Sequence, residues 1–232
     1  MNKLKNLTGF IISLLILTSN YNTLISQSEF AVGHIEWQIT DLKFKDELPG
    51  GDMLKNSTYS LFYIDGKELM VMDMMGGFSI TKVLYDRENA RIKSYLNSMG
   101  DKLMLKMEVP DAPQADINIE VDEADRREIL GFDAFKTKMS IQMEGRPLLK
   151  IDAYVTEKVR PRSSFLQPVH NNPFDGMPLQ LTIVDQNMEI TFEAVLFNEE
   201  FDESVFDIDE SGYQAMDLEQ IQQMGLSGEM GF

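Results

Sequence analysis

Alternating apolar and polar residues predict that most of this chain folds as β-structure. Residues 129–161 are the clearest example, because apolar or small side chains recur at every second position over 137–143 and again over 149–155. A period of two is typical of strands with one buried face. Between the two runs, Glu144-Gly145 predicts a hairpin turn, since glycine accepts a positive φ without steric cost.

The same pattern predicts further strands along the chain. We expect them at residues 31–44, 57–64, 67–74, 78–86, 90–97, 102–109, 177–185 and about 190–196. Asp65-Gly66 between two of these runs is a strong hairpin signal. Alternation over 117–121 is weaker, and the charged residues 122–127 predict a turn. The short, closely spaced strands favour one domain with an antiparallel meander.

The run 67–74 is apolar on both faces, with Leu69 and Val71 on one side and Met70, Met72 and Met74 on the other. Such a strand is buried on both sides or faces a cavity. Methionine fills irregular gaps in a core, and it also lines surfaces that accept varied apolar ligands. Both readings stay open from the sequence alone.

Residues 1–26 have the features of a secretory signal peptide. Lys3 and Lys5 precede the apolar stretch 10–17, which is too short to span a bilayer of about 30 Å. Cleavage is expected after Ser26 or Ser28. No cysteine follows the apolar stretch, so lipid modification is not expected. We therefore predict a periplasmic or secreted mature chain, 27–232, without a transmembrane span.

Composition narrows the possible functions. The chain has no cysteine, two histidines and a net charge of −17, which disfavours thiol chemistry, histidine-rich metal sites and nucleic-acid binding. No nucleophile elbow or phosphate-binding loop occurs. Residues 207–212 match the start of a calcium loop, but Leu218 stands where a glutamate ligand is needed. We expect no cofactor, no metal and no enzyme activity, although an acidic-pair hydrolase stays a minor alternative.

Charge is distributed unevenly along the chain. No Lys or Arg follows Arg162, whereas 14 acidic residues do, and residues 126–162 hold nine basic residues. Complementary outer faces on two parts of a sheet would explain this distribution. An acidic docking surface for a basic partner is the alternative. Near the C-terminus, a capping box at 217–220 predicts a short helix over 217–224.

Three segments together resemble a known family. GFDAFKTKM (131–139), IDAYVTEKVRP (151–161) and DGMPLQLTIVD (175–185) are similar to the domain of unknown function 4412 family, and more distantly to the GLPGLI family of exported proteins. The resemblance covers about residues 30–216. It implies a β-rich α+β fold like that of the periplasmic lipoprotein-localisation carriers, a curved antiparallel sheet or half-barrel with short helices covering its concave side. Those carriers bind acyl chains.

Two functions follow as hypotheses. The first is an exported, non-catalytic binding protein that holds a lipid or another hydrophobic ligand in the concave face. The second is a structural or interaction protein of the cell envelope, with a filled core, an acidic docking face and an envelope protein as partner. Strand alternation gives the candidate residues of the concave face as Trp37, Met70, Met72, Met74, Met107, Met139 and Met143.

Overall fold

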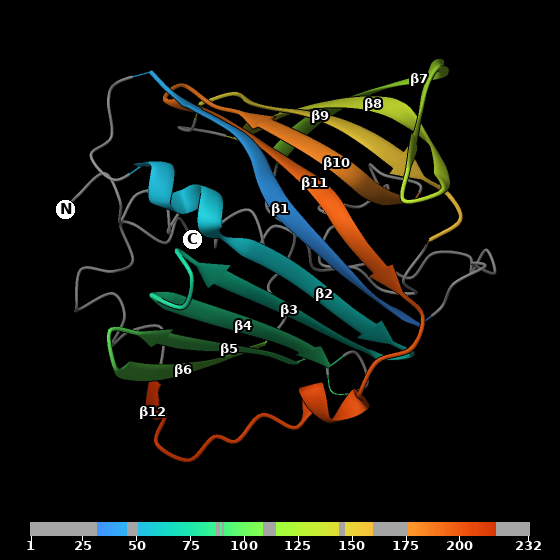
Figure 1. Ribbon diagram of the computed structural model, residues 1–232. Helices are drawn as coiled ribbons and strands as arrows, with labels where there is room; N and C mark the ends of the chain where they lie inside the picture. The colour runs from blue at the N-terminus through green and yellow to red at the C-terminus, as the bar shows by residue number, and fades with distance from the viewer. Residues whose placement is uncertain are drawn as a thin grey trace.

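One curved sheet of twelve strands makes up almost the whole structure (Figure 1). The computed structural model describes residues 32–45, 51–86, 89, 91–108, 115–143, 147–159 and 176–216. The signal peptide, the Glu144-Gly145 turn and the helix expected at 217–224 lie outside these residues. The mainly β fold class and the curved antiparallel sheet are confirmed.

The strands follow the alternation of the sequence closely. They are β1 (Gly33–Phe44), β2 (Thr58–Ile64), β3 (Lys67–Met74), β4 (Ser79–Asp86), β5 (Arg91–Ser98), β6 (Asp101–Glu108), β7 (Ala115–Ile129), β8 (Phe132–Met143), β9 (Leu149–Thr156), β10 (Met177–Val184), β11 (Met188–Asn198) and β12 (Gln214–Met216). Two 3-10 segments, η1 (Gly51–Asn56) and η2 (Glu203–Phe206), are the helical elements among the described residues.

Two antiparallel meanders share β1 as their common strand. The sheet order is β12-β6-β5-β4-β3-β2-β1-β11-β10-β9-β8-β7. We call β2–β6 the first half and β7–β11 the second half. β1 pairs with β2 on one side and with β11 on the other, so the two halves meet along it. β12 is the exception to the antiparallel pattern, because it runs parallel to β6.

Chain connectivity explains why the sheet is curved. Ten inter-strand spacings separate β6 from β7 in the sheet order, which would be roughly 48 Å in a flat sheet. Only six residues, 109–114, join these two strands, and an extended chain of that length reaches about 25 Å. The sheet must therefore curl so that its two halves approach each other, as Figure 1 shows.

Tight turns depend on backbone that only a few residues adopt easily. Gly66 has φ 81° at the tip of the β2–β3 hairpin, which confirms the Asp65-Gly66 prediction. Three further turns place a large apolar residue at positive φ before a glycine: Met75-Gly76 between β3 and β4, Met99-Gly100 between β5 and β6, and Leu130-Gly131 between β7 and β8. A bulky residue at positive φ is uncommon, and of these turns the one at Leu130-Gly131 was not predicted.

One sequence-based prediction is wrong in detail, and another is not supported. The charged residues 122–127 do not end a strand, because β7 continues through them with a bulge between Asp122 and Arg126. Short helices covering the concave side are not supported, since the described residues contain no α-helix. η1 does bury Leu54 in the core.

Candidate functional site

Five of the seven candidate residues lie together in one buried cluster. Trp37 on β1, Met139 on β8 and the three methionines of β3 are each less than 9% exposed. For Met107 and Met143 only the backbone position is described, paired with Ile92 and Ala115 respectively. The alternation therefore selected side chains that share the interior of the sheet.

Strand register explains why residues so distant in sequence share this interior. In the first half, Trp37 faces Tyr59 on β2, and Tyr59 faces Met72 on β3. In the second half, Met139 faces Ile151 on β9, and Ile151 faces Ile183 on β10. Directly opposed residues of antiparallel strands lie on the same face of the sheet. Both rows reach the inner face, which we define as the face that carries this cluster.

Trp37 is fixed in place by a hydrogen bond across the inner face. Its indole N–H donates to the backbone oxygen of Pro178 on β10, 3.0 Å away and buried. The partner of Trp37 on the intervening strand β11 is Ala194, a small residue. A register shift between Pro178 and Gln180 interrupts the ladder at the accepting carbonyl. Trp37 is thus a structural link between the halves as well as part of the apolar inner face.

Two tyrosines on the inner face were not among the candidates. Tyr59 and Tyr63 of β2 are 8% and 0% exposed, and each hydroxyl is buried without a hydrogen-bond partner in the part of the chain that the structure describes. Burial raises the pKa of both phenols. Tyr59 packs edge-on against Phe192, with 4.7 Å between ring centroids. Alternation over 57–64 placed both residues on one face, but it did not mark them as polar sites.

The inner face also holds a buried carboxylate. Glu68, at 1% exposure, lies directly between Tyr63 and Tyr85 in the register of β2, β3 and β4. Gly33 on β1 completes this row, and a Cβ there would lie 2.6 Å from the Tyr63 hydroxyl. The absence of a side chain at Gly33 therefore makes room for that hydroxyl. One end of the inner face is polar, whereas the next row inward, which contains Met70, is apolar.

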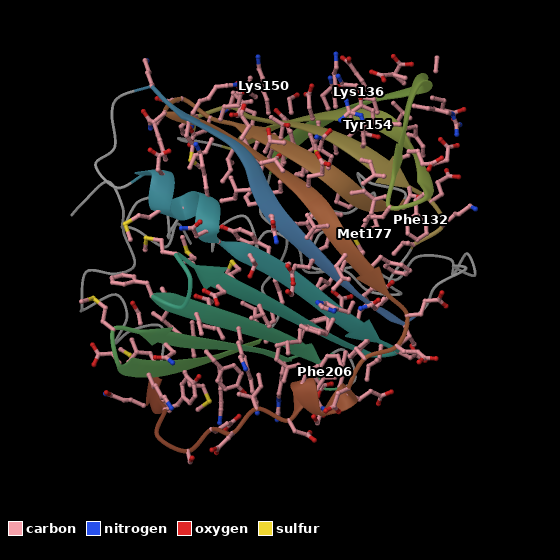
Figure 2. All side chains as sticks on the ribbon, in the orientation of Figure 1. Phe132, Lys136, Lys150, Tyr154, Met177 and Phe206 are labelled. Carbon is pink, nitrogen blue, oxygen red and sulfur yellow. The ribbon has the colours of Figure 1, made fainter. Side chains whose placement is uncertain are left out.

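The outer face of the first half is covered by residues 199–216, which we call the strap. Phe201 packs against Phe62 of β2, and Tyr213 packs against Tyr95 of β5, both edge-on. Figure 2 shows Phe206 on the side of the strap that faces the strands above it. Leu69 and Tyr95 on this outer face are 1% exposed. The two-faced pattern of residues 67–74 is thus explained, since β3 lies between the interior and the strap.

Glu210 anchors the strap by charge. Its carboxylate accepts hydrogen bonds from Lys93 Nζ and from the Tyr95 hydroxyl, each at 2.8 Å. These two bonds lower the pKa of Glu210. Residues 207–212, which match the start of a calcium loop, therefore attach the strap to the sheet through Glu210. Across the described ranges, no group of three or more His, Cys, Asp or Glu side chains is arranged to hold a metal ion.

His34 lies on the outer face of β1, where its ring stacks on Phe62 with centroids 4.0 Å apart. Its Nε2 is buried, and desolvation lowers the pKa of the imidazole. An imidazole stacked in this way is held by packing. In the segments that the structure describes, no helix has both the length and the hydrophobicity needed to cross a membrane.

Comparisons with known proteins add little to this geometry. The chain matches no family model, and no curated protein matches it. The resemblance to the domain of unknown function 4412 family therefore stays a prediction. Among solved structures, the chain is similar to a domain of Vibrio parahaemolyticus that is provisionally named an outer membrane lipoprotein-sorting protein domain, with 8% identity and a TM-score of 0.31 over 78% of this chain and 91% of that one.

Proposed function

We propose that this protein is an exported, non-catalytic binding protein that holds a lipid or another hydrophobic ligand against the inner face of its curved sheet. The observation that carries the proposal is the continuity of that face. Apolar side chains from both halves, including Met72 and Met139, join in one cluster around Trp37. An antiparallel sheet that curls around such a surface has the shape and chemistry to enclose an acyl chain.

Methionine is suited to this role because its side chain is unbranched and polarisable. It can adapt to ligands that differ in shape, whereas branched side chains fix a single packing. Met70, Met72 and Met74 form a row along β3 on the inner face, and all three are buried. This row is the part of the surface that we expect to contact the ligand directly.

Substitution of methionines tests the proposal. We expect Met72→Ala and Met139→Ala to weaken binding of the uncharged fluorescent probe N-phenylnaphthylamine while costing little stability, because part of each side chain would contact the ligand instead of the protein. Met104→Ala is the matched control. Met104 is equally buried, but it faces Tyr95 and the strap on the outer face. That variant should lose about 2–5 kcal/mol of unfolding free energy and keep the affinity of the parent.

A structural or interaction role in the cell envelope is the second candidate, and two observations favour it. The four candidate methionines whose side chains are described, Met70, Met72, Met74 and Met139, are as well buried as core residues. The strap also presents exposed acidic side chains to solvent, namely Glu199, Glu200, Asp202, Glu203, Asp207 and Asp209. This role predicts that Met72→Ala and Met139→Ala each lower the unfolding free energy by about 2–5 kcal/mol. It also predicts that the parent does not bind N-phenylnaphthylamine, and that an envelope protein crosslinks to the strap.

Export is part of both proposals and has its own test. The expected cleavage sites place Gln27 or Glu29 at the start of the mature chain. N-terminal sequencing of the protein from the cell envelope should find one of these residues. An uncut chain recovered from the cytoplasm would contradict export and leave only the binding surface to be explained.

A further inference from the structure

Hydrogen bonding of the tyrosines differs between the two faces of the sheet. On the outer face, the Tyr95 hydroxyl donates to Glu210 at 2.8 Å, and the Tyr154 hydroxyl donates to Asp125 at 3.0 Å. On the inner face, the Tyr59 and Tyr63 hydroxyls have no partner in the described part of the chain. The fold therefore satisfies the hydroxyls of Tyr95 and Tyr154 and leaves those of Tyr59 and Tyr63 with unused hydrogen-bonding capacity.

A buried hydroxyl without a partner is costly, so its retention needs a physical reason. Phenylalanine would fill the same volume at either position without that cost. Both hydroxyls belong to β2, four residues apart, which places their backbone positions roughly 13 Å from each other. Leu61 stands between them, and Met70 and Met72 lie beside them on β3. Two polar points are thus set into an apolar surface whose length matches part of an acyl lipid.

Charge around Tyr63 restricts what these hydroxyls can bind. After burial, the carboxylates of Glu199 and Glu68 are the further causes that raise the pKa of Tyr63. The phenol stays protonated and can donate a hydrogen bond. The same carboxylates would repel an anionic group at this place. An uncharged oxygen acceptor, such as an ester carbonyl or a hydroxyl, meets both conditions.

We propose that Tyr59 and Tyr63 are ligand-binding residues whose hydroxyls hydrogen-bond to uncharged oxygen atoms of an acyl lipid. The ligand class is therefore a neutral, oxygen-bearing acyl lipid, rather than a bare hydrocarbon or a fatty-acid anion. Its oxygen-bearing group lies between Tyr63 and Tyr59, and its acyl chain lies against the methionines of β3. This inference rests on the proposed binding function.

The test removes single oxygen atoms. Tyr59→Phe and Tyr63→Phe are compared with Tyr95→Phe, which deletes a hydroxyl on the outer face. Binding is measured as displacement of N-phenylnaphthylamine by monopalmitoylglycerol, by palmitate and by hexadecane. We expect the two inner variants to bind monopalmitoylglycerol about three- to tenfold more weakly, as the loss of one hydrogen bond implies. Their hexadecane affinity should be unchanged, and Tyr95→Phe should match the parent with every competitor.

Other outcomes overturn the inference. Unchanged monopalmitoylglycerol affinity in both inner variants would show that the hydroxyls do not contact the ligand, while the binding function itself would stand. An equal loss for hexadecane would indicate a change of shape instead of a lost hydrogen bond. If the ligand-free variants have a lower thermal midpoint but unchanged affinity, the hydroxyls hydrogen-bond to buried water and not to the ligand. If no competitor displaces the probe from the parent protein, the proposed function fails, and this inference fails with it.

Discussion

The outer faces of the two halves of the sheet are built differently. In the first half the outer face is apolar at Leu69 and Tyr95, and the strap covers it. In the second half the outer face is polar and meets solvent, with Thr182 and Thr191 joined through their hydroxyls at 2.9 Å. Lys136, Lys150 and Tyr154 all lie on this upper surface in Figure 2. Both halves share one interior, yet only one of them needs a second layer.

This difference shows how strand patterning decides the number of layers. A strand that alternates apolar and polar residues buries one face and can leave the other in water. Strand β3 is apolar on both faces, so it requires cover on its outer side as well. The strap supplies that cover with aromatic side chains, and Glu210 holds it with charge-assisted hydrogen bonds. The acidic, aromatic composition of residues 199–213 is therefore a consequence of what it covers.

The largest expected effect comes from opening the layer beneath the strap. Leu69→Ala should lower the unfolding free energy by about 2–5 kcal/mol, because it creates a cavity at a site that is 1% exposed. Thr182→Val at the bare outer face should cost less than about 1 kcal/mol, since water can replace the lost hydrogen bond. Urea unfolding of both variants measures the contrast. Equal losses would mean that the two faces are packed alike.

A smaller effect should follow from removing the charge that anchors the strap. Glu210→Gln weakens the hydrogen bonds from Lys93 and Tyr95, so we expect the unfolding free energy to fall by about 1–2 kcal/mol. Raising the salt concentration should reduce the difference between variant and parent, because the site is partly exposed. Thermal unfolding at low and high salt provides the measurement. A stability difference that does not respond to salt would argue against an electrostatic anchor.

The same anchor predicts how stability depends on pH. The pKa of Glu210 is lowered in the folded protein by Lys93 and Tyr95 from its ordinary value of 4.5. Its contribution is therefore complete above pH 4.5 and is lost as the pH falls through the lower folded-state pKa. The parent should lose its stability advantage over Glu210→Gln across that acidic range. If the difference between the two proteins stays constant there, the carboxylate does not stabilise the strap.

The smallest effect is expected on the polar outer face. Arg127 stacks on the Tyr154 ring at 4.5 Å and donates to Gln180 at 2.7 Å, but it is exposed. Arg127→Met should change the unfolding free energy by less than about 1 kcal/mol. Chemical denaturation of Arg127→Met and Glu210→Gln under the same conditions shows which site contributes more to the unfolding free energy. A larger loss for Arg127→Met would show that the second half also depends on interactions across its outer face.

Most strands could be predicted from the sequence because alternation reports a buried face directly. The turn at Leu130-Gly131 was missed, since leucine at positive φ is rare and gives no local signal. Without that turn, residues 122–127 looked like the end of a strand. Pairing of β1 with β11 also could not be predicted, because alternation fixes faces but not partners. The acidic composition of the chain after Arg162 was visible in the sequence, but the position of the strap over β2–β6 was not.

The candidate site was predicted unevenly for a related reason. Alternation placed Met70, Met72 and Met74 on one face of β3, because sharing a face within one strand depends on period alone; that Trp37 and Met139 join the same cluster depends on the strand register. It could not separate Tyr59 and Tyr63 from ordinary amphipathic core residues. What distinguishes them is the lack of a hydrogen-bond partner, and that depends on the neighbours that the fold supplies.

The central position of β1 has a consequence for the order in which the molecule folds. β1 is the first strand in the chain, and β11, its partner on one side, is the eleventh, so that His34 pairs with Asn198. The first half can form by local hairpins as soon as it is synthesised. One edge of β1 then stays open until the second half has formed, and an open edge can pair with another chain. Contacts this distant in sequence slow folding, so we expect a chain that stops before β11 to aggregate.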